Sequence, residues 1–71
     1  MRENAQKLLE ACNMARNAGK DFPTIWNELL RASPLILGLP EQHHDGVAIQ
    51  MRIRLANGQA LIFNDGNFEL T

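Results

Sequence analysis

The sequence predicts an α+β domain in which two N-terminal helices pack on one face of a three-stranded antiparallel meander (α-α-β-β-β). Three observations lead to this fold class. Apolar residues recur at helical spacing through the first half of the chain, they alternate every second residue from Val47 onward, and turn dipeptides divide the alternating region. With 71 residues and no repeat or linker, residues 1–71 are expected to form a single small domain.

The first helix is expected over residues 3–18. Ala5, Leu8, Cys12 and Ala15 recur at helical spacing and form an apolar stripe. Gly19 follows as the residue that would end the helix in the left-handed conformation.

A second helix is expected to begin near Pro23, because proline suits the first helical position and keeps Phe22 outside the helical region. Asp21 adds a negative charge near the positive end of the helix dipole. The helix should end before Pro34. Its apolar stripe consists of Ile25, Trp26, Leu29 and Leu30.

The run SPLILGLP, residues 33–40, allows two interpretations. Ser33 can cap a single helical turn that starts at Pro34 and ends at Gly38, or residues 35–37 can form a short buried strand. We favour the helical turn.

Alternation of apolar and polar residues predicts three strands, near residues 47–55, 59–63 and 67–70. Asn57-Gly58 and Asp65-Gly66 are typical hairpin turns and separate them. Both hairpins connect neighbouring strands, so the sheet should be an antiparallel meander.

The register across Asn57-Gly58 decides which residues share a face. A two-residue loop would put Leu61 and Phe63 on the same face as the arginines. A three-residue loop that begins at Ala56, with a left-handed Gly58, instead segregates the apolar residues. Because a one-residue slip turns over all side chains of a strand, we expect the segregated register. It places Val47, Ile49, Met51, Ile53, Leu61, Phe63, Phe68 and Leu70 under the helices, and Ala48, Gln50, Arg52, Arg54, Ala60 and Ile62 on the outer face.

The segment GLPEQHHDGV, residues 38–47, holds the densest cluster of reactive side chains: Glu41, His43, His44 and Asp45. A zinc site needs three or four ligands directed at one ion, whereas adjacent residues of an extended segment point to opposite sides. No CxxC or HExxH motif supports the two histidines. We interpret the segment as a polar connecting loop and predict no metal site.

The sequence also lacks a recognisable catalytic constellation. Ser33 is the only serine, and capping explains its place before Pro34; Cys12 is the only cysteine and lies on an apolar stripe, where a thiol is usually inert. The five glycines are isolated and form no phosphate-binding loop. We therefore predict that the protein is not an enzyme and needs no cofactor.

The charge balance makes nucleic-acid binding an unlikely function. The chain has seven basic and eight acidic residues, without the basic footprint of nucleic-acid binders. It has no apolar run of about 18 residues that would span a membrane and no signal-peptide stretch. Its lone cysteine fits a reducing compartment, so we expect a cytoplasmic protein.

The predicted function is that of a small interaction or regulatory module that self-associates or binds another protein. A chain of this length has a marginal core, and the predicted sheet leaves one face and an edge strand without cover. We expect the partner to bind the outer sheet face at Gln50, Arg52, Arg54 and Ile62, since arginine is enriched in interfaces.

The alternative is a nucleic-acid-binding regulator of winged-helix type, because two helices followed by a hairpin can imitate that plan. Residues 33–46 would then supply the recognition segment, yet they contain no lysine or arginine. The wing tip LANGQ, residues 55–59, contains none either.

Overall fold

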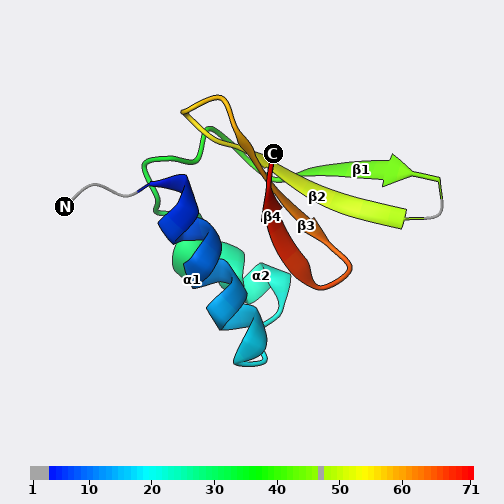
Figure 1. Ribbon diagram of the computed structural model, residues 1–71, viewed down its shortest axis with the longest axis horizontal. Helices are drawn as coiled ribbons and strands as arrows, with labels where there is room; N and C mark the ends of the chain where they lie inside the picture. The colour runs from blue at the N-terminus through cyan, green and yellow to red at the C-terminus, as the bar shows by residue number, and fades with distance from the viewer. Residues whose placement is uncertain (1–3, 47) are drawn as a thin grey trace.

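The computed structural model describes residues 4–46 and 48–71, which form two helices and a four-stranded antiparallel sheet (Figure 1). The first helix is α1 (Ala5–Asn17), and the second begins as α2 (Phe22–Ile25) and continues as the π-helical turn η1 (Trp26–Leu30). The strands β1 (Glu41–Asp45), β2 (Ala48–Arg54), β3 (Ala60–Asn64) and β4 (Asn67–Leu70) pair in chain order. The α+β class is confirmed, but the prediction of three strands was wrong, because β1 adds a fourth.

Helix α1 lies within the predicted residues 3–18 but is shorter, since Asn4 and Ala18 are its caps and residue 3 lies outside the described residues. At its start, the Asn4 side chain accepts a hydrogen bond from the Lys7 N–H at 2.9 Å. At its end, Gly19 has φ +92° and its N–H donates to the Arg16 carbonyl, while the Lys20 N–H donates to the Ala15 carbonyl. This pair of bonds is a Schellman motif, which requires the left-handed residue that glycine supplies.

The second helix begins at Phe22, so the expectation that Pro23 would keep Phe22 outside the helix was wrong, and the helix changes its winding halfway. Asp21 caps it by accepting a hydrogen bond from the Thr24 N–H at 3.0 Å. Further along, the Arg31 N–H donates to the Trp26 carbonyl, five residues earlier, at 2.8 Å. In an α-helix, residues five apart point about 140° away from each other, whereas a five-residue turn aligns them. The wide turn explains why Ile25 and Leu30 are both fully buried in one core.

Residues 31–40 connect the helices to the sheet. Ser33 caps a tight turn, in which the Leu35 N–H donates to Ser33 Oγ and the Ile36 N–H to the Ser33 carbonyl. Ile36 then forms an antiparallel bridge with Leu55. The favoured helical turn from Pro34 to Gly38 was therefore wrong, because hydrogen bonds to the end of β2 hold this segment extended after one tight turn.

The two predicted hairpins have the predicted registers. Met51 faces Phe63 and Ile53 faces Leu61, as the three-residue loop requires, and Gly58 has φ +90°. In the second hairpin Phe63 faces Phe68 and Leu61 faces Leu70. Its turn residues Asp65 and Gly66 have φ 52° and 83°, the positive values of a type I′ turn.

Strand β1 is the segment that we interpreted as a loop, and that interpretation was wrong. Glu41 to Asp45 pair with Arg52 to Ala48, so every second residue of the histidine segment bonds its backbone groups to β2. Gly46, with φ +66°, follows β1. Val47, where we expected the first strand to begin, lies outside the described residues.

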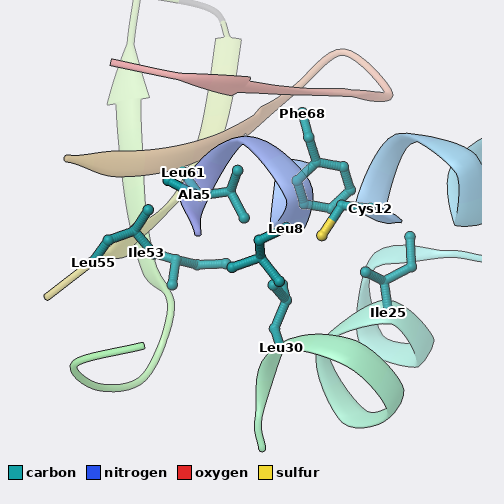
Figure 2. Packing of buried hydrophobic residues seen from close by; sticks show 9 residues of the cluster. All are labelled: Ala5, Leu8, Cys12, Ile25, Leu30, Ile53, Leu55, Leu61 and Phe68. Carbon is teal, nitrogen blue, oxygen red and sulfur yellow. The ribbon is translucent and has the colours of Figure 1, made fainter. Parts of the chain in front are cut away.

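The helices lie on one side of the sheet, as expected, and share one core with it (Figure 2). Helix α1 packs beside β4, whereas the hairpin of β1 and β2 extends away from both helices (Figure 1). Three aromatic rings, of Phe22, Phe63 and Phe68, meet at the edge of this core with centroids 4.8 to 6.1 Å apart. The buried residues of this core cluster are Ala5, Leu8, Cys12, Ile25, Leu30, Ile53, Leu55, Leu61 and Phe68.

Candidate interaction surface

The four predicted contact residues do lie on one face of the sheet. Gln50, Arg52 and Arg54 alternate along β2, and Ile62 of β3 lies directly opposite Arg52. They differ in accessibility, because Arg54 is exposed, Gln50 and Arg52 are partly exposed, and Ile62 is only 7% exposed.

The low exposure of Ile62 follows from its place in an inner strand. It lies between Arg52 of β2 and Glu69 of β4, whose side chains share its face. Long charged side chains can lay their apolar stems over such a neighbour. Ile62 therefore belongs to the floor of this surface and offers little area to a partner.

Strand β1 brings to the same face a residue that the sequence interpretation left in a loop. Glu41 is the register partner of Arg52, and its Oε1 atom lies 3.3 Å from Arg54 Nε. The two side chains are 49% and 74% exposed, so solvent screens the pair and its net contribution is about 0–1 kcal/mol. The pair orients the Arg54 side chain more than it stabilises the fold. No apolar alternation in EQHHD marked it as a strand.

The two histidines of β1 point to opposite faces, as the spacing argument expected for an extended segment. His43 is opposite Gln50 on the outer face, whereas His44 is opposite Ile49 on the other face. Both histidines are exposed. They form no shared site.

Arg52 holds one polar atom that the fold does not satisfy. Its Nε atom is enclosed and has no hydrogen-bond acceptor among the residues that the structure describes. A buried donor without an acceptor costs free energy, and a charged donor costs more.

An apolar segment that the sequence did not single out adjoins the arginines. Leu37 and Leu39 are 64% and 79% exposed, and together with Gly38, Glu41 and Arg54 they line a hollow of about 230 Å³. A second hollow of about 260 Å³ shares residues 37–39 and is also lined by Trp26, Arg31 and Ile36. We call residues 37–39, with Glu41 and Arg54, the leucine–arginine surface.

The backbone of this surface is held in place by the sheet. The Leu37 N–H donates to the Arg54 carbonyl at 3.0 Å, and the Ala56 N–H donates to the Leu35 carbonyl at 2.8 Å. The exposed Leu37 therefore stands on a backbone that is tied to the end of β2, and Leu39 follows two residues later. The sequence signal for them was the apolar run itself, which we had assigned to a helical turn.

Among the described residues, no group of three or more His, Cys, Asp or Glu side chains could hold a metal ion, and no helix is long and apolar enough to cross a membrane. Cys12 is fully buried, and burial raises the pKa of its thiol to about 11. Comparisons with protein-family models, curated proteins and solved structures found no match to this chain.

Proposed function

We propose that this protein is a small, non-enzymatic interaction module that self-associates or binds another protein through the leucine–arginine surface. The observation that carries the proposal is the exposure of Leu37 and Leu39 beside a charged pair on a fixed backbone. Contiguous exposed apolar side chains rimmed by charge are typical of interaction sites.

The neighbouring residues give the surface the composition of a binding hot spot. Trp26 and Arg31 lie along the second hollow, and tryptophan and arginine are enriched among the residues that dominate binding energy. Because residues 35–37 are already bonded to the sheet, little ordering entropy should be lost on binding. A partner would offer an apolar side chain to the hollow and an oxygen acceptor to the exposed guanidinium of Arg54.

Two features speak against the winged-helix alternative. Residues 33–40 contain a turn and a bridge but no helix, and residues 41–45 form a strand. The segment that would have to act as a recognition element therefore offers no helix for a DNA groove. Its lack of lysine and arginine supports the same conclusion.

The proposal is tested with Leu37→Ser and a matched control, Met14→Ser. Met14 is 72% exposed on α1, so both changes remove an exposed apolar side chain of similar size. Sedimentation velocity measures self-association, and quantitative co-purification from cell extract measures binding of another protein. We expect Leu37→Ser to weaken the association by about tenfold or more, as a hot-spot residue should, and Met14→Ser to leave it unchanged.

Equal behaviour of both variants would show that the leucine–arginine surface is not the contact. Arg52→Glu supplies an independent arm, because it reverses the charge of the residue with the unsatisfied Nε atom. A charged residue at Ile62 would not test the surface, because this position is only 7% exposed and a buried charge there would disturb the fold itself. Tight, salt-sensitive binding of DNA or RNA in a gel shift would favour the winged-helix alternative instead.

A further inference from the structure

The two edges of the sheet, at β4 and at β1, differ in whether helix side chains form hydrogen bonds with them. At the β4 edge, the Phe68 N–H donates to Asn13 Oδ1 at 3.0 Å, and Asn13 Nδ2 donates to the Phe68 carbonyl at 3.2 Å. Arg16 Nε donates to the Gly66 carbonyl, just before β4, at 3.1 Å. The Asn13 side chain therefore takes the hydrogen-bonding positions at Phe68 that a further strand would use.

The β1 edge carries no such cover in the described part of the chain. Strand β1 pairs with β2 alone. The helices lie near the opposite edge of the sheet, where α1 packs beside β4 (Figure 1). In an antiparallel pair, every second residue of an edge strand turns its N–H and C=O away from its neighbour. Such unpaired groups are a template for another strand.

We propose that β1 of one molecule pairs antiparallel with β1 of a second copy, about a two-fold axis at Gln42, and so joins two sheets into one of eight strands. A strand that adds to an open edge must itself carry unpaired backbone groups, and the open edge of a second copy carries them. In this chain β1 offers one, whereas Asn13 and Arg16 occupy the edge at β4. The projecting hairpin also keeps the helices of both copies away from the contact.

The side chains of β1 favour this register over its neighbour. A two-fold axis at Gln42 places Glu41 opposite His43 of the second copy, twice, on the outer face of the joined sheet. An imidazole N–H can donate to a carboxylate, and its protonated form also carries the opposite charge. An axis at His43 would instead set Glu41 opposite Asp45, two acidic residues. Opposite-charge pairs across strands are stabilising and like-charge pairs are not.

The proposed contact lies along the strand edge and shares only Glu41 with the leucine–arginine surface. It rests on the proposed function only in that self-association is one of its two forms. A contact along one five-residue strand is small, so the dimer should be weak and concentration-dependent. The dimer should be detectable by sedimentation velocity over a series of protein concentrations from tens of micromolar to about one millimolar.

The test is a charge exchange across the proposed axis. His43→Glu sets a glutamate opposite Glu41 on both sides of the axis and should raise the dissociation constant about tenfold. Glu41→His combined with His43→Glu restores the complementary pairs and should return the constant to within about threefold of the original value. His44→Glu is the matched control, because it changes the net charge equally but lies on the other face, opposite Pro40 of the second copy.

Hydrogen exchange locates the contact in the same samples. We expect the β1 amides to exchange more slowly as the protein concentration rises, and circular dichroism to show that every variant is folded. A protein that stays monomeric to one millimolar would overturn the inference. So would a dimer in which the charge exchange has no effect. Self-association that is lost in Leu37→Ser but kept in His43→Glu would support the leucine–arginine surface and overturn the strand pairing.

Discussion

Cys12 shows how one residue of this small core is governed by burial. The side chain is 0% exposed on the inner face of α1, among the apolar residues of the core (Figure 2). Desolvation raises the pKa of its thiol from the ordinary 9.0 to about 11. The residue therefore acts as a small hydrophobic side chain and not as a nucleophile.

We predict that a thiol reagent such as DTNB at pH 8 modifies Cys12 only when the protein unfolds. The thiolate is the reactive form, and the folded state both shields the sulfur and keeps its proton. The modification rate should rise in parallel with the fraction unfolded as urea is added. Rapid modification without urea would contradict complete burial.

Cys12 should also make the stability depend on alkaline pH. Because its pKa is raised in the folded state, its contribution is present below pH 9 and is lost as the pH rises toward 11, where the unfolded chain releases the proton first. A shift of this size corresponds to about 2–3 kcal/mol. We expect the free energy of unfolding of the wild type to fall by that much more than that of Cys12→Ala, measured by urea unfolding at pH 8 and pH 11.

At the scale of elements, the π-helical turn of η1 allows two residues that are five positions apart in the second helix to be buried in the same core. Ile25 and Leu30 are five residues apart and both fully buried, which a uniform α-helix would not allow. The wide turn accommodates one residue more than an α-helical turn between them, and Asn27 is exposed within it.

Deleting Asn27 should therefore be tolerated. The deletion would make the two buried residues four apart, which an α-helical turn places on one face. We expect a thermal unfolding midpoint within about 5 °C of the wild type by circular dichroism. The matched deletion of the exposed Glu10 in α1 should prevent folding, because it would turn Leu8 and Cys12 about 100° out of line. Equal damage from both deletions would contradict this account of the turn.

The two hydrogen bonds between Asn13 of α1 and Phe68 of β4 are a second feature at the scale of elements. Asn13→Ala would leave both the N–H and the carbonyl of Phe68 without their partner. We expect a loss of about 1–3 kcal/mol in urea unfolding, since unsatisfied buried groups carry that cost. Gln6→Ala, at an exposed position of the same helix, is the control and should change stability by less than about 0.5 kcal/mol.

For the whole molecule, the protection of backbone amides from hydrogen exchange should decrease across the sheet, from the strands next to the helices to the hairpin of β1 and β2. Strand β3 lies between two strands and contains the buried Leu61 and Ile62, whereas the residues of β1 with a described exposure are exposed. Parts of a protein with few buried contacts open at low free-energy cost. In dilute solution, hydrogen exchange followed by NMR should therefore be fastest in β1 and slowest in β3. Equal protection of both strands from hydrogen exchange would show that contacts besides the pairing with β2 hold β1 in place.

The sequence predicts those parts of this fold in which local pattern and burial agree. The register at Asn57-Gly58 follows from segregation of apolar residues, and the end of α1 follows from Gly19. Strand β1 was missed because EQHHD has no apolar alternation; it forms because the edge of β2 offers hydrogen bonds to any backbone. The winding of η1 was missed because one apolar stripe fits both an α-helix and a wider turn.

The candidate surface could be predicted only in part for a related reason. Alternation along β2 places Arg52 and Arg54 on one face whatever the number of strands. The exposure of Ile62 depends on its flanking strands, and the exposure of Leu37 and Leu39 depends on where the connecting segment crosses the end of β2. These are tertiary properties that no local pattern encodes.

The contact between α1 and β4 has a consequence for the order of events during synthesis. Asn13 and Phe68 are 55 positions apart, so α1 leaves the ribosome well before the strand with which its edge contacts form. The hairpins, in contrast, join neighbours and can close within microseconds once translated. Until β4 emerges, the apolar side of α1 has no complete partner and is available to a chaperone. Nascent chains stalled before β4 should therefore be cleaved rapidly by protease within α1, and chains stalled well after β4 should resist.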